Sequence, residues 1–168
     1  MKRTATRVFQ RVAQVAVGVA LAAVVACGGS SSATPGPTPQ PLATDVERTT
    51  FAPSLGVHLD AMQHRASGLY VQDIAQGTGA VATPGRTVIV RYTGWLANGT
   101  QIDAGEISVI LGTNKTIRAW EEGLLGMRAG GKRRLVVPPA LGYGSKGSGD
   151  VIPPNAVLVF ELEATSIL

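Results

Sequence analysis

Apolar residues follow a regular spacing only after Gly68, where their pattern predicts strands and one helix. The strand-like segments are rich in β-branched and aromatic residues or alternate in polarity, and turn residues separate them. They are residues 69–75, 87–96, 107–111, 132–137 and 156–167. Residues 117–127 carry apolar side chains three to four positions apart, which indicates a helix. We therefore predict an α+β domain over residues 68–168, with the helix covering one face of a five-stranded antiparallel sheet.

The first 26 residues have the pattern of a secretory signal peptide. Residues 1–11 are basic and contain no acid, and residues 12–26 are apolar except for Gln14. A membrane-spanning helix needs roughly 20 apolar residues, and this stretch is shorter. We therefore expect residues 1–26 to be an export signal.

The only cysteine, Cys27, follows this segment in the sequence VVACG. The arrangement resembles the lipobox of bacterial lipoproteins, which implies a lipid on Cys27 and a membrane anchor outside the cytoplasm. The alternative is an incidental cysteine beside an ordinary cleavage site. Gly28 is not the Asp that retains lipoproteins at the inner membrane, so the same resemblance implies the outer membrane, facing the periplasm. A single cysteine also excludes an internal disulfide, so the fold must rest on its core.

Two further segments precede the regular region. Residues 28–44 contain four prolines, three glycines and three serines without any charge, which predicts a disordered tether behind the lipidated cysteine. Residues 45–67 show no clean period, and we expect a loosely packed N-terminal extension with one short turn. His58 and His64 lie in this extension without cysteines or paired carboxylates, so we interpret them as solvated side chains rather than metal ligands.

Charge changes the picture once the signal is removed. Four of the 15 Lys and Arg residues and none of the 11 acids lie in residues 1–26, so the remaining chain is formally neutral. The basic pI of 9.6 belongs to the precursor. We therefore expect no nucleic-acid partner. The basic triplet at residues 132–134 alternates faces in a strand, and we interpret it as the solvated start of that strand.

The region after Gly68 lacks the residues of covalent catalysis. It contains no cysteine or histidine and no serine in a Gly-x-Ser-x-Gly turn. The sequence GYGSKG at residues 142–147 matches a dinucleotide fingerprint in letters, but Gly149, Pro153 and Pro154 follow where a helix is required. What remains is a set of apolar and aromatic residues at strand ends, at the start of the helix and in a glycine-rich loop, where side chains can converge on a pocket.

Three motifs carry a family resemblance. They are VRYTGWLANGTQID at residues 90–103, IRAWEEGL at residues 117–124, and Tyr143-Gly followed by IPPNAVLVFEL at residues 152–162. In this order and at this spacing they resemble the FKBP-type peptidyl-prolyl cis-trans isomerases, from about Gly68 to Leu168. The resemblance implies a half-barrel sheet wrapped around the short helix, with a pocket for a proline ring between them.

The resemblance also implies a role for each matching residue. Trp120 would form the floor of the pocket, the Tyr143 hydroxyl would donate a hydrogen bond to a substrate carbonyl, and the Ile117 N–H would bind another carbonyl. Tyr92, Phe160, Ile152 and Tyr143 would form the walls, with Asp103 at the polar rim. The implied catalytic residues are Tyr92, Asp103, Ile117, Trp120, Tyr143 and Phe160, and the implied substrate contacts are Ile102, Ile107, Thr116, Val151 and Ile152.

The implied activity is rotation about X-Pro peptide bonds in exported proteins, with no cofactor or metal. Resonance sets a barrier near 20 kcal/mol, and a dry pocket favours the less dipolar twisted amide over the planar one. Macrolides are the implied inhibitors. The alternatives are a proline-binding chaperone or docking module with little turnover, and a surface lipoprotein whose target is recognised by residues 45–67.

The rim departs from the family pattern. Ile102 and Ile107 stand where the family has aromatic residues, and the segment 103–107 is about five residues shorter than its pattern. This segment also lacks the arginine that pairs with the rim aspartate. We therefore expect Asp103 to be unpaired and the pocket to be less aromatic.

Overall fold

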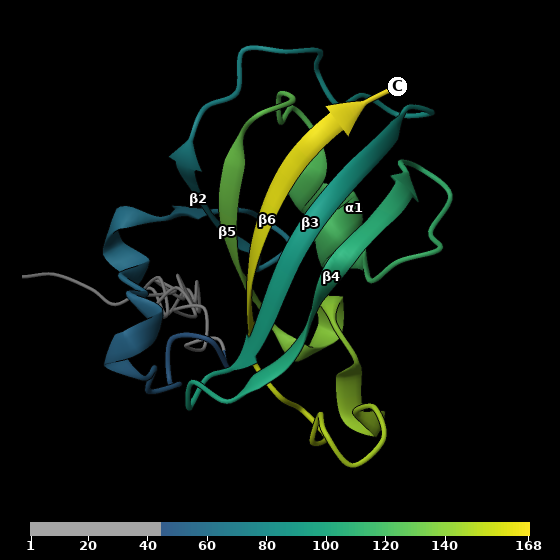
Figure 1. Ribbon diagram of the computed structural model, residues 1–168. Helices are drawn as coiled ribbons and strands as arrows, with labels where there is room; N and C mark the ends of the chain where they lie inside the picture. The colour runs from purple at the N-terminus through teal and green to yellow at the C-terminus, as the bar shows by residue number, and fades with distance from the viewer. Residues whose placement is uncertain (1–44) are drawn as a thin grey trace, which may run out of the picture. The chain divides into compact units, whose positions relative to one another are not determined.

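In the computed structural model, residues 45–168 are described, and they form one antiparallel sheet with one α-helix (Figure 1). All of these residues belong to one compact unit. The sheet order is β1-β2-β5-β6-β3-β4. The strands are β1 (Gln63–His64), β2 (Tyr70–Ala75), β3 (Thr87–Leu96), β4 (Gln101–Ile110), β5 (Lys132–Val137) and β6 (Leu158–Ile167). The predicted α+β class is confirmed, with a two-residue sixth strand added by the extension.

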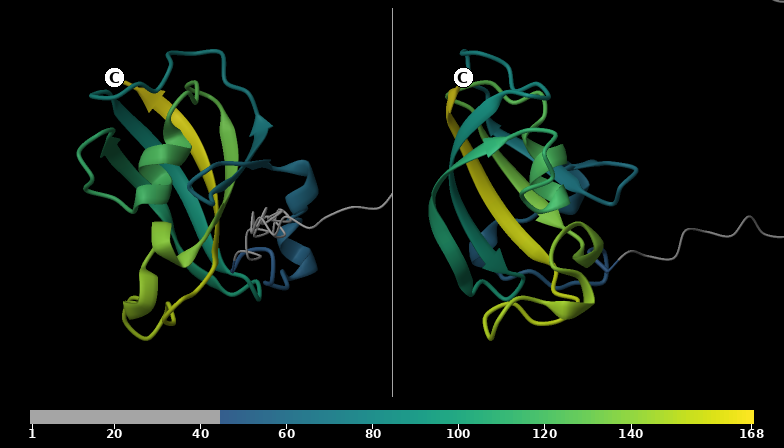
Figure 2. Two further views of the ribbon diagram at one scale, coloured as in Figure 1. Left: turned by 180° about the vertical axis from the view of Figure 1, so that it is seen from behind. Right: turned by 90° about the vertical axis from the view of Figure 1, so that its right-hand side faces the viewer.

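Helix α1 (Arg118–Leu124) packs on one face of the sheet, as the view from behind shows (Figure 2). Its buried side chains include Trp120 and Leu124, which join the main core cluster with inward-facing residues of β3, β5 and β6. Gly123 allows a close approach, because a Cβ at this position would collide with the methyl groups of Leu135 on β5. Glycine at residue 123 therefore allows α1 to pack closer to the sheet than a helix with a side chain at this position could.

Two element lengths differ from the expectation. The helix ends at Leu124, not Met127, because Leu125 adopts an extended ψ of 132° and Gly126 a positive φ of 77°. Met127 is still buried, but from the loop. Strand β4 begins at Gln101 rather than at Ile107, because the short rim segment pairs with β3 as far as Gly94 without looping out.

The extension is packed, which corrects the expectation of a loose segment. Its two 3-10 helices, η1 (Pro53–Leu55) and η2 (Leu59–Ala61), lie against the sheet face opposite to the one that α1 covers. Val46, Leu55 and Met62 are buried there, in a second apolar cluster with residues of β2, β5 and β6. The side of β6 that faces the extension therefore carries a buried valine, Val159. His58 and His64 are exposed, and the His64 ring stacks on Tyr70 with their centroids 4.3 Å apart.

Polar contacts reinforce the packing of the extension. Arg134 on β5 donates to the Gly56 carbonyl at 2.7 Å and to the Glu161 carboxylate at 2.6 Å. Burial alone would raise the pKa of Glu161, but hydrogen bonds from Arg134 and Lys132 outweigh it and hold this pKa below its usual 4.5. The extension is thus joined to the sheet by apolar contacts and by an arginine between them.

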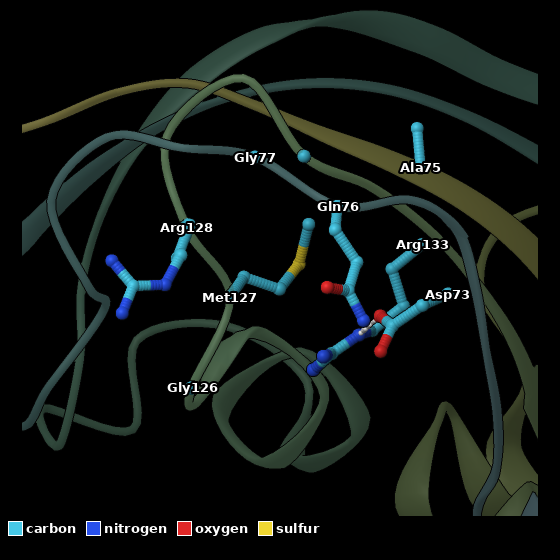
Figure 3. A pocket seen from close by; sticks show the side chains of 9 residues that line it. Asp73, Ala75, Gln76, Gly77, Gly126, Met127, Arg128 and Arg133 are labelled. Atoms are coloured by element: carbon cyan, nitrogen blue, oxygen red, sulfur yellow. Dashed lines mark hydrogen bonds and ion pairs between the residues drawn. The ribbon is translucent and has the colours of Figure 1, made fainter.

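Arg133 is buried, so the interpretation of the whole basic triplet as solvated was wrong. Its guanidinium donates to Asp73 on β2 at 2.5 Å, and to the carbonyls of Gly123 and Leu125 at 2.6 and 3.2 Å. Arg133 and Asp73 lie beside a small cavity of about 150 Å³. In Figure 3, the Arg128 side chain extends away from these two residues. The last carbonyls of a helix lack intrahelical donors, and Arg133 supplies them here.

Within residues 45–168, no helix is long and apolar enough to cross a membrane.

Candidate functional site

A cavity of about 800 Å³ opens between α1, the strands β3, β4 and β6, and the loop from Pro138 to Val157. The eleven residues to which the resemblance gave catalytic or substrate-binding roles all line it. They are Tyr92, Ile102, Asp103, Ile107, Thr116, Ile117, Trp120, Tyr143, Val151, Ile152 and Phe160. The cavity is large enough for a small ligand, and most of its wall is apolar. Tertiary structure thus brings together residues up to 68 positions apart in the chain, from Tyr92 to Phe160.

Three aromatic rings form the inner part of the cavity. Trp120 is only 5% exposed and lies at the centre, with Tyr92 and Phe160 on either side. Its ring centroid is 4.9 Å from that of Tyr92 and 5.5 Å from that of Phe160, and both pairs are edge-to-face. This geometry is favourable for aromatic pairs and holds each ring in one orientation. The floor is therefore rigid and apolar.

Gly94 on β3 makes room for one of these rings. A Cβ at this position would lie 2.5 Å from Cε1 of Phe160, closer than side chains tolerate. Gly105 on β4 faces Tyr92 in the same way, but with an ordinary contact distance of 3.6 Å to the tyrosine ring. The position of Phe160 thus requires glycine at residue 94, whereas the position of Tyr92 does not require glycine at residue 105.

Asp103 is held by two hydrogen bonds, which corrects the expectation that it is unpaired. The Tyr92 hydroxyl donates to its Oδ2 at 2.7 Å, and the Ala104 N–H donates to its Oδ1 at 2.8 Å. The hydrogen bond to Asp103, with partial burial and the carboxylate charge, raises the pKa of Tyr92 from 10.0 to about 12. Tyrosine therefore replaces the missing arginine as the partner of the rim carboxylate, and it remains a protonated donor at neutral pH.

Three polar groups around the helix start have no hydrogen-bond partner among the described residues. They are the backbone N–H of Ile117, Oγ1 of Thr116 and Nε1 of Trp120. Ile117 precedes α1 as its N-cap residue, so its N–H does not belong to the helical ladder. It lines the cavity, and its N–H is available to a carbonyl of a bound chain.

The outer wall is a loop with its own internal bonds. Ser148 and Ile152 exchange two backbone hydrogen bonds of 2.9 and 3.0 Å, and the Asn155 N–H donates to the Gly144 carbonyl at 2.8 Å. Ile152 is consequently buried, whereas Tyr143 and Val151 remain 39% and 53% exposed. The tyrosine hydroxyl is thus at the mouth of the cavity, where a ligand would meet it.

The cavity also contains residues that the sequence reasoning did not single out as site residues. Lys115 and Arg118 flank Ile117, and Gly142, Ser148 and Gly149 lie in the outer loop. Arg118 is part of the IRAWEEGL motif, so the motif could have indicated it. Nothing in the local pattern around Lys115 indicated that this exposed residue reaches the cavity.

The lining defines the chemistry that the cavity can perform. No cysteine, histidine or cluster of metal-ligating side chains lines it within residues 45–168. It offers a dry aromatic floor, a hydroxyl at the mouth and a free backbone donor at the helix start. The size and lining of this cavity suit an apolar ring with carbonyls next to it.

Comparison with known proteins gives the same family on independent grounds. Residues 79–165 match the family model described as FKBP-type peptidyl-prolyl cis-trans isomerase. The chain is 43% identical over 105 residues to the "FK506-binding protein" of Neisseria meningitidis serogroup B, covering 60% of this chain and 96% of that protein. It is 46% identical over 91 residues to "FK506-binding protein 2" of Yarrowia lipolytica, covering 51% of this chain and 63% of that protein.

Solved structures agree with the sequence relatives. The crystal structure of AtFKBP13 has a TM-score of 0.60 and 30% identity, and the match covers 64% of this chain and 98% of that one. FkpA from Escherichia coli has a TM-score of 0.59 and 35% identity, with 64% and 51% covered. The aromatic cavity, the matching motifs and these relatives place the chain in the family of FKBP-type peptidyl-prolyl cis-trans isomerases.

Proposed function

We propose that this isomerase rotates X-Pro bonds inside the cavity around Trp120, by binding the twisted amide more tightly than the planar one. The observation that carries the proposal is the combination of a rigid aromatic floor with a lining that contains no cysteine or histidine. Rotation about the bond needs no nucleophile, because the barrier comes from amide resonance and no covalent bond is broken. The twisted form also has less charge separation than the planar form. An apolar environment therefore favours the twisted form relative to the planar ground state.

Hydrogen-bond donors complete the proposed mechanism. The proline ring lies on Trp120, between Tyr92 and Phe160. The Tyr143 hydroxyl and the free Ile117 N–H bind carbonyls on either side of the rotating bond, so that rotation occurs between two fixed ends. Catalysis by a factor of 10³ would require about 4 kcal/mol of preferential binding, which a few desolvated contacts and hydrogen bonds can supply.

A protease-free isomerisation assay tests this proposal. NMR exchange measures the cis–trans rate of a short X-Pro peptide with the wild type, with Trp120→Ala and with Trp95→Phe, which alters the tryptophan on the opposite side of the sheet. We expect turnover by the wild type and Trp95→Phe, and loss of at least about 100-fold in Trp120→Ala, because the floor is removed. Circular dichroism confirms that each variant is folded.

A wild type that binds the peptide but turns it over no faster than Trp120→Ala would contradict the enzymatic proposal. That result would favour a proline-binding docking module instead. FK506 is the inhibitor to include, because the relatives are named FK506-binding proteins. We propose that it competes for this cavity, and that Ile102 and Ile107 weaken its binding by replacing aromatic contacts.

We further propose that the enzyme acts on exported proteins from a lipid anchor at Cys27, in the outer membrane facing the periplasm. Support comes from the basic and apolar segments of residues 1–26, from Cys27 at their end and from the uncharged tether of residues 28–44. These residues lie outside the described part of the chain. Detergent phase separation of the protein from its native host tests the anchor: the wild type should enter the detergent phase and Cys27→Ser the aqueous phase. Wild-type protein in the aqueous phase would contradict it.

A further inference from the structure

Strand β4 is the outermost strand of the sheet on the side of the cavity. It pairs with β3 on one side, and among residues 45–168 no strand pairs with its other side (Figure 1). Its pairing with β3 runs from Thr87 opposite Ile110 to Gly94 opposite Asp103 without a bulge. The sheet therefore ends in a long regular edge, and alternate backbone groups along it point outward.

Three hydrogen bonds identify the outward groups. The Leu111 N–H donates to the Arg86 carbonyl at 3.0 Å and the Leu111 carbonyl accepts from the Gly85 N–H at 2.9 Å, so both backbone groups of Leu111 face the chain that leads into β3. The Ala104 N–H donates to the side chain of Asp103 instead of to β3. Bonded and non-bonded pairs alternate in an antiparallel ladder, so residues 104, 106, 108 and 110 direct their N–H and C=O groups away from β3.

In the middle of this edge, the outward backbone groups make no hydrogen bonds within residues 45–168. The Ala104 N–H is bound to Asp103, and the Ile110 carbonyl accepts from the Thr113 hydroxyl at 2.8 Å. Between them, the backbone N–H and C=O of Glu106 and Ser108 have no partner among the described residues. These four groups are spaced as an adjoining antiparallel or parallel strand requires.

The free groups lie next to the cavity. Ile107, between Glu106 and Ser108, directs its side chain into the cavity wall, and Asp103 does so four residues earlier. A polypeptide with its proline ring in the cavity would leave it past Ile107, and its next residues would meet the outward groups. The edge is thus continuous with the substrate pocket.

Natural sheet edges are commonly protected by lysine, proline or a bulge. Strand β4, with the sequence QIDAGEISVI, contains neither lysine nor proline. Its only register shift lies at Gly94/Trp95, beyond Asp103 and away from the free groups. Because segment 103–107 is short, the strand runs unbroken past the pocket.

We propose that the β4 edge binds the substrate chain that flanks the proline, as an added strand of the sheet. The inference rests on the proposed isomerase function and names its substrate class: extended, unfolded polypeptides rather than short prolyl peptides. Proline has no N–H and can offer the edge only its carbonyl, so the residues that pair fully with the edge are those that flank it. Strand addition uses main-chain hydrogen bonds, which suits an enzyme that accepts many sequences.

Peptide length and one backbone donor provide the test. The substrates are an acetylated and amidated Ala-Leu-Pro-Phe peptide and the same peptide extended by about four Ser and Thr residues on each side. The variants are Ser108→Pro, which removes an outward N–H, and Ser108→Ala, which keeps it. Proline is tolerated at an edge position whose N–H faces solvent. NMR exchange gives KM and kcat for each combination.

We expect the wild type and Ser108→Ala to show a KM at least about threefold lower for the long peptide, because each net hydrogen bond changes an equilibrium by roughly two- to tenfold. Ser108→Pro should lose this preference and keep its turnover of the short peptide. Equal KM values for both peptides in the wild type, or a preference retained in Ser108→Pro, would overturn the proposal. No turnover of either peptide would contradict the isomerase mechanism instead.

Amide hydrogen exchange in the wild type covers the case in which Ser108→Pro does not fold. The long peptide should slow exchange at Glu106 and Ser108, whereas a version methylated at its backbone nitrogens should not. Sedimentation of the free protein identifies the remaining occupant. Self-association that Ser108→Pro abolishes would mean that a second copy occupies the edge, and would overturn the proposal.

Discussion

Gly94 on β3 faces the ring of Phe160 on β6, and the space between them sets the wall of the pocket. The motif around Gly94 indicated a family position, but not the reason that glycine stands there. Asp103 gives the complementary case. Its lack of an arginine partner was readable in the sequence, whereas its hydrogen bond from Tyr92 depends on how β3 and β4 pair.

Replacing Gly94 with alanine should damage the pocket through a single methyl group. The new Cβ would lie 2.5 Å from Phe160, so the ring must move or the strands must separate. We expect a loss of about 1–3 kcal/mol in the free energy of unfolding and a clear loss of kcat/KM. Gly105→Ala is the control, since its Cβ would meet Tyr92 at an ordinary 3.6 Å. Equal effects in denaturant unfolding would contradict this explanation.

The pH dependence should reflect the hydrogen bond between Tyr92 and Asp103. Because this bond raises the pKa of Tyr92 to about 12, its contribution is complete below the ordinary pKa of 10 and is lost as the pH rises through about 12. We therefore expect kcat/KM to be flat from about pH 6 to 9. An ultraviolet titration should show one tyrosine that ionises late, absent in Tyr92→Phe. Late ionisation that persists in Tyr92→Phe would assign it to another residue.

Helix α1 has only seven residues and depends on the sheet for its stability. Such a helix is marginal by itself, and packing and capping must hold it. Trp120 packs it from inside, Gly123 lets it approach Leu135, and Arg133 supplies donors at its last turn. The position of Trp120 thus depends on Arg133, a buried residue of β5 that does not line the large cavity around Trp120.

Arg133→Met should destabilise the protein far more than Arg128→Met, although both arginines line the small cavity of Figure 3. Arg133 is 8% exposed, and its loss leaves Asp73 and two helix carbonyls without a donor, whereas exposed Arg128 makes one bond to the Gly79 carbonyl. We expect a loss of about 2–4 kcal/mol for Arg133→Met and under about 1 kcal/mol for Arg128→Met. Urea unfolding measures both, and similar losses would refute the role of Arg133.

At the scale of the whole molecule, the sheet buries apolar residues on both faces. Helix α1 and the main core cover one face, and the extension covers part of the other with Leu55 and Met62. We therefore expect the extension to unfold together with the part that carries the pocket, although it adds no residue to the cavity lining.

Leu55→Ala tests whether the extension and the pocket unfold together. We expect a loss of about 2–4 kcal/mol from removing a buried side chain, one unfolding transition, and unchanged kcat/KM at temperatures where the variant is folded. Leu168→Ala, at a residue that is 70% exposed, should change little. Two separate transitions followed by circular dichroism and by tryptophan fluorescence would show that the extension is independent.

The sequence was sufficient for the fold class, for the order of five strands and the helix, and for eleven residues of the pocket, because local periodicity and three motifs carry that information. Tertiary structure alone decided what depends on pairing between distant segments: the partner of Asp103, the burial of Arg133, the packing of the extension, and the length of β4. The length and register of a strand pair depend on both strands and on the turn that joins them, so the residues of one strand alone do not determine them. The free edge beside the pocket is therefore visible only in the folded sheet.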